Sequence, residues 1–239
     1  MGPESVTDVT SREVFVVIPA WNEERRIAAT VGAAARIAPV VVVDDGSRDA
    51  TARRAREAGA RVVTRTRRGG KGAALASGVA ALPATTRYVL FLDADLEGSA
   101  ADAAPLLEAV RSGSCAMAVA VPPPQPGGGH GLVVRLARDG IRKLTGFEAA
   151  APLSGQRCLT AEAARAVRYA PRFGVEVGLT VDLIGAGYRV AEVPAELRHR
   201  VTGTDWRAQL HRARQYRDVW LALMFRSRFR SRFRRRRSR

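Results

Sequence analysis

The sequence predicts an α/β protein with a mainly parallel central sheet and helices on both faces. The first observation behind this prediction is a series of short apolar runs, such as residues 14–18 and 40–43, which suit strands buried on both faces. The second is a helical pattern after each run, so that strands and helices alternate along the chain. The third is a polar or glycine-rich motif after each strand. In a parallel sheet these motifs meet at one edge, where ligands bind.

Three units of strand, motif and helix open the chain. Their strands and motifs are residues 14–18 with Pro19-Ala20-Trp21-Asn22-Glu23-Glu24, residues 40–43 with Asp44-Asp45-Gly46-Ser47, and residues 60–64 with Arg68-Gly69-Gly70-Lys71-Gly72. The first helical pattern runs through Ile27 and Val31. The second begins near Thr51, and the third is rich in alanine and extends to Ala81.

The fourth predicted strand, residues 88–92, runs directly into Asp93-Ala94-Asp95. Two carboxylates one residue apart at the end of a buried strand suit a hard divalent cation, Mg²⁺ or Mn²⁺, which usually reaches a protein together with substrate phosphates. For this motif alone, an acidic turn after a core strand explains the residues equally well. The convergence of four such motifs on one crevice favours a ligand site.

Length and composition indicate a single catalytic domain. A chain of 239 residues with 46% hydrophobic content can bury a sizeable core. Cys115 and Cys158 lack metal-type spacing, so we expect free thiols in a reducing cytosol. Residues 1–12 lack the apolar core of a signal peptide, and no run of about 18 apolar residues predicts a membrane span.

The expected parts of the chain are a disordered N-terminus (1–12), the catalytic domain (13–225) and a basic tail (226–239). Within the domain, residues 122–131 combine a proline cluster with three consecutive glycines, which predicts a mobile loop. Such a loop at a substrate edge serves as a lid or acceptor loop, with a plain solvent loop as the alternative. A basic amphipathic helix, residues 132–144, follows it.

The net charge of +16 is concentrated at the end of the chain, where nine of the last fourteen residues are arginine. Part of this excess is compositional, because lysine occurs only at Lys71 and Lys143. Just upstream, arginines alternate with apolar residues, which are Trp206, Leu210, Ala213, Val219, Trp220, Leu223, Met224 and Phe225. The pattern predicts a basic amphipathic segment on an anionic membrane surface.

Two alternatives to this membrane contact remain open. The first is a helix that packs on the core and is followed by a disordered tail. The second is a nucleic-acid-binding arm, since phosphate backbones attract the same charge. The aspartates expected to line the crevice make the second alternative weaker, and we expect no nucleic acid partner.

The motifs occur in a fixed order. They are Val17-Ile18-Pro19-Ala20-Trp21-Asn22-Glu23, then Val43-Asp44-Asp45-Gly46-Ser47 with Asp49 and Thr51, then Gly70-Lys71-Gly72 with Gly78, and finally Asp93-Ala94-Asp95-Leu96-Glu97. In this order they closely resemble the family 2 glycosyltransferases of the GT-A fold, a Rossmann-like nucleotide-sugar-binding fold, over residues 13–225. Leu96-Glu97 is similar to the polyprenyl-phosphate sugar synthases of the dolichol-phosphate mannose type. Residues 152–155, 174–179 and 199–200 are similar to the glucosyl-3-phosphoglycerate synthases.

The resemblance implies metal-dependent transfer of a sugar from a UDP- or GDP-sugar, with Mg²⁺ or Mn²⁺ as the cofactor. The residues implied to border the nucleotide-sugar are Pro19, Ala20, Trp21, Glu23, Asp45, Lys71, Asp93 and Ala94. The implied metal ligands are Asp95, Glu97 and His199, with a surface histidine between two arginines as the alternative for His199. Asp95 and Arg157 are the implied catalytic residues. The candidate acceptor-binding residues are Arg135, Arg138, Arg157, Glu176 and Arg200.

The acceptor is expected to carry a phosphate. The resembled polyprenyl-phosphate enzymes place an aspartate a few residues ahead of the segment that matches Ser154 to Arg157, and alanines 149–151 stand there instead. An alcohol acceptor generally needs a carboxylate base, whereas a phosphate monoester is already anionic at neutral pH. Retaining transfer through the phosphate of the donor would also dispense with a base.

Polyprenyl phosphate is the first expectation for the acceptor, and a small phosphorylated metabolite is the alternative. A non-catalytic relative that binds nucleotide or nucleic acid is a third possibility, which the presence of Lys71, Asp93 and Asp95 disfavours. We expect a cytoplasmic protein, with peripheral attachment to the inner face of the plasma membrane as a further expectation.

Overall fold

The computed structural model describes residues 13–123, 131–197 and 213–227. Its strands are β1 (Val14–Ala20), β2 (Val40–Asp44), β3 (Arg61–Thr64), β4 (Tyr88–Phe91), β5 (Met117–Val121), β6 (Arg157–Thr160) and β7 (Val190–Pro194). Its helices are α1 (Ile27–Ala34), α2 (Thr51–Glu57), α3 (Lys71–Ala80), α4 (Ala104–Arg111), α5 (Leu132–Thr145), α6 (Ala161–Ala166) and α7 (Val175–Gly185), with the short 3-10 helices η2 (Glu97–Ala103) and η3 (Arg172–Gly174). A further helix spans residues 213–227.

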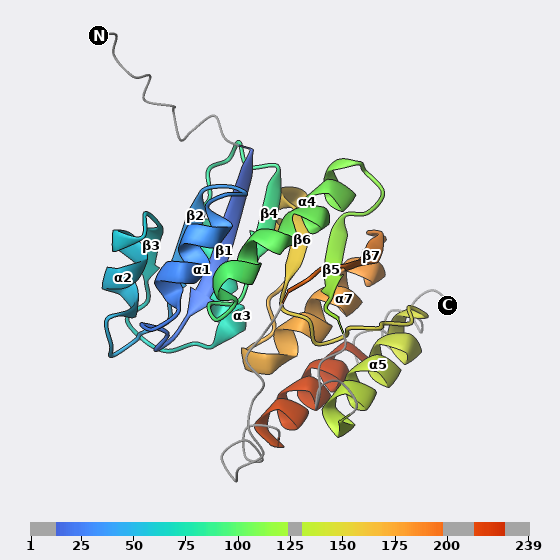
Figure 1. The fold of residues 1–239 in the computed structure, drawn as a ribbon. Coiled ribbons are helices and arrows are strands. Elements are labelled where there is room, and N and C mark those ends of the chain that lie inside the picture. Colours follow the sequence, from blue (N-terminus) through green and yellow to red (C-terminus); the bar gives the residue numbers. More distant parts are fainter. Residues whose placement is uncertain (1–12, 124–130, 198–212, 228–239) are drawn as a thin grey trace, which may run out of the picture.

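The strands form one seven-stranded sheet in the order β3-β2-β1-β4-β6-β5-β7 (Figure 1). The first four strands are parallel, and β5 and β7 are parallel to each other. Strand β6 is antiparallel to both of its neighbours, β4 and β5. The predicted fold class is therefore confirmed. Because β6 runs backwards, its first residue, Arg157, pairs with Phe91 at the end of β4, and the segment before β6 reaches the edge where β1, β2 and β4 end.

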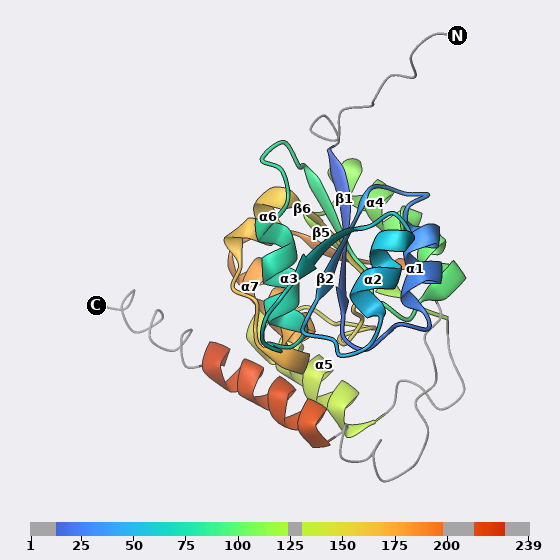
Figure 2. The same ribbon diagram turned by 90° about the vertical axis from the view of Figure 1, so that its left-hand side faces the viewer.

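Helices cover both faces of the sheet, because alternate residues of each buried strand point to opposite sides (Figure 2). Val16 and Ile18 of β1 belong to the cluster of buried residues under α1, α2 and α4. Phe15 and Val17 belong to the cluster under α3, α6 and α7. The continuous apolar runs thus reflect burial on both faces, as in other sheets of this class.

A third cluster joins α5, α7 and the helix of residues 213–227, which lie side by side at the crevice end of the sheet (Figures 1 and 2). Val219 and Leu223 are buried in it. Glycine allows this close packing, since a Cβ at Gly140 would overlap Leu223 and one at Gly174 would lie 2.8 Å from the Cβ of Ala222. Packing on the core, given above as an alternative, is correct for Val219 and Leu223.

Other predictions from the sequence fall outside the described residues. They concern residues 1–12, most of the loop 122–131, Trp206, Leu210, and most of the basic tail after Arg226. Within the described part of the chain, no helix is long and apolar enough to cross a membrane.

Candidate functional site

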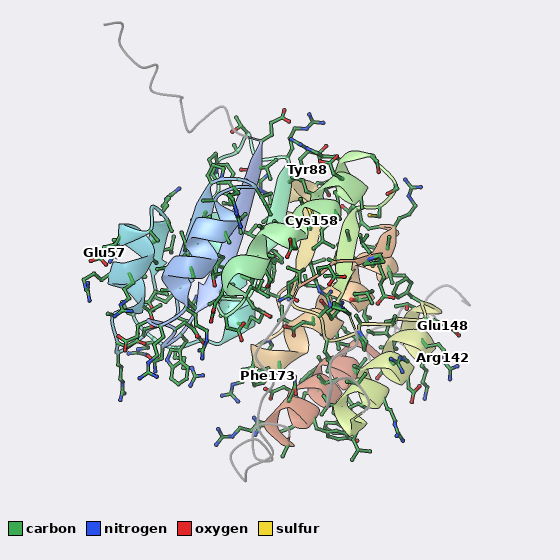
Figure 3. The ribbon with its side chains drawn as sticks, viewed as in Figure 1. Glu57, Tyr88, Arg142, Glu148, Cys158 and Phe173 are labelled. Atoms are coloured by element: carbon green, nitrogen blue, oxygen red, sulfur yellow. The ribbon has the colours of Figure 1, made fainter. Side chains whose placement is uncertain are left out.

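The ends of β1, β2 and β4, the start of α3 and the segment before β6 meet at one edge of the sheet. Figure 3 labels residues at both ends: Tyr88, the first residue of β4, lies at the far end, and Phe173 of η3 lies at the crevice end. The parallel strands β1, β2 and β4 bring three of the four motifs here, and Lys71 opens α3 beside them. The predicted convergence of the four motifs is present in the structure.

Side chains after β2 hold the loop after β1 by its backbone. Ser47 Oγ accepts a hydrogen bond from the Asn22 amide at 2.9 Å, and Thr51 Oγ1 accepts one from the Glu23 amide at 2.8 Å. Asp49 Oδ2 accepts a third from the next amide, that of Glu24, at 3.2 Å. The Ser-x-Asp-x-Thr pattern therefore fixes the shape of the neighbouring loop, a contact that only the fold reveals.

Asp45, predicted to meet the nucleotide base, organises the turn that precedes α3. It is buried, and its carboxylate accepts hydrogen bonds from Arg65 Nε at 2.8 Å, from the Gly69 amide at 2.9 Å and from the Gly70 amide at 2.7 Å. The Gly69 amide also lies 3.1 Å from Asp45 Oδ2, so both oxygens of this carboxylate are bonded within the protein, and its contact with a nucleotide base stays a prediction. Arg65 was not singled out from the sequence.

Trp21 and Arg68 form the outer wall of this side of the crevice. The Arg68 guanidinium carbon lies 3.3 Å from the centroid of the Trp21 ring, a cation–π contact between the loops after β1 and β3. Trp21 is exposed, as a residue that borders a ligand needs to be. Pro19 and Ala20, which pair with Val43 and Asp44 of β2, set the backbone beneath it.

Lys71, Asp93 and Glu176 form the charged centre of the crevice. Lys71 Nζ lies 2.5 Å from Asp93 Oδ1 and 2.8 Å from Glu176 Oε1. Burial alone would lower the pKa of Lys71, but the two carboxylates outweigh burial and raise that pKa. Gln156 completes the group, because its Nε2 donates to Asp93 Oδ2 at 2.8 Å.

Gly155 makes this cluster possible. A Cβ at position 155 would overlap Lys71 Nζ and lie 2.6 Å from Asp93 Oδ2. The segment before β6 therefore approaches the ion pair more closely than any other residue type allows.

Arg157 does not lie where its predicted catalytic and acceptor-binding roles require. It is 1% exposed, and its guanidinium donates to the Ser154 carbonyl and to Thr180 Oγ1, both at 2.9 Å. Burial lowers its pKa to about 10. Neighbouring residues at the start of a strand point to opposite faces, so only one of Gln156 and Arg157 can face Asp93, and it is Gln156. Alternation alone does not say which of the two faces the site, so the sequence offered no signal for Gln156.

Asp95 lies beside Glu23 on the next loop. The pKa of Glu23 is raised, first by burial and then by the nearby Asp95 charge. Glu97, a predicted metal ligand, forms an ion pair in which its Oε1 lies 3.3 Å from Arg26 Nε, and Arg26 also lies 3.3 Å from Glu23. A divalent cation would relieve the repulsion between the carboxylates of Glu23 and Asp95, whose oxygen atoms suit Mg²⁺ or Mn²⁺.

In the described part of the chain, no group of three or more histidine, cysteine, aspartate or glutamate side chains could hold a metal by itself. The donor set fits a cation that takes part of its ligands from substrate phosphates. His199, the other predicted ligand, lies outside the described residues, as does Arg200.

The remaining predicted acceptor residues lie on α5. Arg138 donates to the carbonyls of Ala149 and Ala150 at 3.0 and 3.2 Å, so it supports the alanine segment. Glu192 of β7 accepts from the amides of Ala150 and Ala151 at 2.8 and 2.7 Å. Arg135 is exposed. Their acceptor-binding roles stay predictions.

Fold and site together define a glycosyltransferase of the GT-A type. The model of the family "Glycosyl transferase family 2" matches residues 15–149, more than half of the chain, and the chain belongs to this family. The resemblance inferred from the four motifs is thereby confirmed.

Several relatives share one name. The chain is 31% identical over 208 residues to glucosyl-3-phosphoglycerate synthase of Mycobacterium tuberculosis (strain ATCC 25618 / H37Rv), and 33% identical over 199 residues to that of Mycolicibacterium paratuberculosis. Each match covers 72% of this chain and 60% of the relative's length, so the chain spans less than two thirds of these curated relatives.

Solved structures of the M. tuberculosis synthase agree with the fold. One, in complex with Mn²⁺, uridine diphosphate and phosphoglyceric acid, has a TM-score of 0.75 at 27% identity and covers 90% of this chain and 78% of that chain. Another, in complex with Mg²⁺ and uridine diphosphate, has a TM-score of 0.77 at 26% identity and covers 95% and 84%.

Proposed function

We propose that this protein is a metal-dependent glycosyltransferase that moves a sugar from a nucleotide-sugar, of the UDP type, to a small phosphorylated acceptor. The observation that carries the proposal is the placement of Asp95 beside the Lys71–Asp93–Gln156 group at the carboxyl end of β4. Strand ends of this kind are where open α/β sheets bind ligands. The complexes of the M. tuberculosis synthase with Mn²⁺, uridine diphosphate and phosphoglyceric acid support the choice of ligands.

On the donor side, the loops after β1, β2 and β3 would hold the nucleotide. Trp21 offers an exposed ring, and Asp45 holds the turn at Gly69 and Gly70 that follows Arg68. Lys71 and Gln156 fix both oxygens of Asp93, which is thereby oriented to accept from ribose or sugar hydroxyls. Asp95 would hold Mg²⁺ or Mn²⁺, whose charge stabilises the leaving diphosphate when the ion is bound.

For the acceptor, a small phosphorylated molecule has better support than polyprenyl phosphate. The relatives named above are called glucosyl-3-phosphoglycerate synthases, and a structure of one carries phosphoglyceric acid. Alanines occupy positions 149–151, where the resembled polyprenyl-phosphate enzymes carry an aspartate. The absence of that base suits an acceptor that is already anionic. Glu176 is committed to Lys71, so we assign it the role of fixing that lysine.

The test is a panel of donors and acceptors with the full-length protein. UDP-glucose and GDP-mannose are each offered with 3-phosphoglycerate, undecaprenyl phosphate or a neutral sugar alcohol, with Mn²⁺ or EDTA. We expect nucleotide release from UDP-glucose, with 3-phosphoglycerate, in Mn²⁺ only. Product from the neutral alcohol alone would contradict the requirement for a phosphorylated acceptor. No nucleotide release under any condition would contradict the proposed glycosyltransferase activity.

A specific observation supports a second, additional role, peripheral contact with an anionic membrane. Trp220 and Phe225 on the helix of residues 213–227 are 42% and 59% exposed, and the arginine-rich end of the chain follows this helix. Aromatic side chains beside arginines suit a lipid headgroup surface. We expect the full chain to sediment with phosphatidylserine vesicles at low salt, and Trp220→Ala with Phe225→Ala to weaken this. Equal binding to phosphatidylcholine vesicles, or binding that raised salt does not reduce, would contradict the proposal.

A further inference from the structure

Thr30 of α1 forms two hydrogen bonds with the loop that carries Asp95. Thr30 is fully buried, and its hydroxyl donates to the Ala94 carbonyl at 2.9 Å and accepts from the Glu97 amide at 2.9 Å. These two groups lie immediately before and two residues after Asp95. The loop is thereby pinned on both sides of the aspartate.

The second of these bonds holds a residue in an unusual backbone conformation. Glu97 has φ +50°, in the left-handed region that residues other than glycine seldom adopt. Such a conformation persists where surrounding contacts enforce it. The Thr30 hydroxyl bonds the amide of Glu97, and Arg26, one turn earlier in the chain, pairs with its carboxylate.

The geometry distinguishes this contact from ordinary helix chemistry. A threonine inside a helix usually bonds a carbonyl of its own preceding turn or faces solvent. The Thr30 hydroxyl instead reaches a carbonyl 64 residues further along the chain. Valine has nearly the same shape and would fill the same space, so core packing alone does not call for a hydroxyl here.

The loop that Thr30 holds carries two of the proposed metal ligands, Asp95 and Glu97. A metal ligand binds tightly when its position is fixed in advance.

We propose that Thr30 is a positioning residue for the metal–diphosphate site: its hydroxyl fixes the backbone on both sides of Asp95 in the geometry that binds the divalent cation. This inference rests on the proposed function. It adds a determinant of metal affinity that touches neither the metal nor the substrate.

Three full-length variants test the inference. Thr30→Val removes the hydroxyl and keeps the shape, Thr30→Ser keeps the hydroxyl, and Thr86→Val is the control. Thr86 is a buried threonine at the opposite end of the sheet, before β4, and its hydroxyl has no hydrogen-bond partner among the residues that the structure describes. The first readout is the affinity for Mn²⁺ in the presence of UDP, measured by electron paramagnetic resonance of free Mn²⁺.

We expect Thr30→Val to weaken Mn²⁺ binding about tenfold, the size of effect that the loss of two buried hydrogen bonds justifies. Thr30→Ser should stay within about threefold of wild type, and Thr86→Val should match wild type. UDP affinity in EDTA should change little in all three. Should Thr30→Val not fold, the comparison of Thr30→Ala with Thr30→Ser gives the same contrast.

The second readout needs no ligand. Hydrogen exchange at the Glu97 amide should be slow in wild type and Thr30→Ser and fast in Thr30→Val. Unchanged Mn²⁺ affinity in Thr30→Val, or equal losses in the valine and serine variants, would overturn the inference alone. If wild type does not bind Mn²⁺ with UDP, the proposed function is wrong and this inference falls with it.

Discussion

The two sides of the crevice are built from different kinds of contact. On the donor side, short polar side chains bond backbone groups of neighbouring loops, as Ser47, Thr51 and Thr30 do. Across Asp93, long charged side chains bond one another, as Lys71 does with Glu176. The first arrangement fixes the backbone of the loops directly, with ion pairs such as that of Arg65 with Asp45 in support. The second depends on a balance of charges, so the loss of a single partner leaves another one buried and unmatched.

The largest expected effect is that of replacing Asp95, the proposed ligand of the divalent cation. Asp95→Ala should lower turnover about 1,000-fold or more, because it removes the proposed ligand of the cation that would stabilise the leaving diphosphate. The measurement is nucleotide release from the donor with Mn²⁺. Asp102→Ala, at an exposed aspartate of the short helix η2 that follows the Asp95 loop, is the matched control and should retain activity. Full activity of Asp95→Ala, or donor affinity that EDTA does not change, would show that the metal is held elsewhere.

The second largest effect concerns the close approach of Gly155 to Lys71 and Asp93. Gly155→Ala should reduce turnover about 100-fold, because a methyl group there displaces Lys71 and Asp93 from each other. It should also lower the free energy of unfolding by about 1–3 kcal/mol, measured by urea denaturation. Gly32→Ala is the control: no atom of the described part of the chain lies within 4 Å of a Cβ at this helical position, and we expect a small gain in stability. Normal kinetics in Gly155→Ala would mean that this segment moves freely.

A third substitution probes the charge balance. Glu176→Gln should lower the free energy of unfolding by about 1–3 kcal/mol, since Lys71 keeps only Asp93 as an ionic partner. The pKa of Lys71 is raised on folding, so its ion pairs contribute fully below its unfolded value of 10.5 and are lost only as pH rises through the folded pKa. The loss should therefore be constant between about pH 6 and 9.

The control for this charge test is Glu57→Gln, which alters an exposed pair with Arg53 and should change stability by less than about 0.5 kcal/mol. If the loss of unfolding free energy in Glu176→Gln instead shrinks steadily over this pH range, a group other than Lys71 determines its pH dependence. Equal losses in both variants would remove the distinction between the buried and the exposed pair.

The smallest expected effect concerns the contact between the helix of residues 213–227 and α7. Arg226 Nε donates to Asp182 Oδ1 at 2.7 Å, and this pair ties the helix of residues 213–227 to α7. Arg226→Ala should lower the free energy of unfolding by about 1 kcal/mol, because the pair is partly screened by solvent. Mn²⁺ binding with UDP should be unchanged. A marked loss of Mn²⁺ affinity would show that this helix also supports the metal site.

The donor side could be predicted because its signals are local. Two strands are predicted by apolar runs that end in aspartates, at Asp44-Asp45 and at Asp93-Ala94-Asp95. The aspartates also mark the end of each strand that faces the crevice. The supporting contacts could not be predicted. Thr30 and Arg65 act on residues 20 to 67 positions away, and no periodicity marks them.

The opposite side was harder to predict for a different reason. The reversed direction of β6 follows from its pairing with β4 and β5, which four residues of sequence do not encode. With that direction unknown, Arg157 was the natural choice for a phosphate ligand, although it is buried and Gln156 faces the site. Similarly, Val219 and Leu223 have the pattern of a lipid-facing stripe, but the glycines of α5 and η3 admit them to the core.

The reversed strand also has an evolutionary consequence. The segment that leaves the sheet at Val121 returns at Gln156, whose carbonyl accepts from the Ala120 amide at 3.0 Å. Its two ends are therefore anchored side by side on adjacent strands at the crevice edge. The entropy of closing such a segment rises only slowly with its length. A change in the length of this part of the chain should thus cost little stability, because the sheet and the loops after β1, β2 and β4 can stay in register.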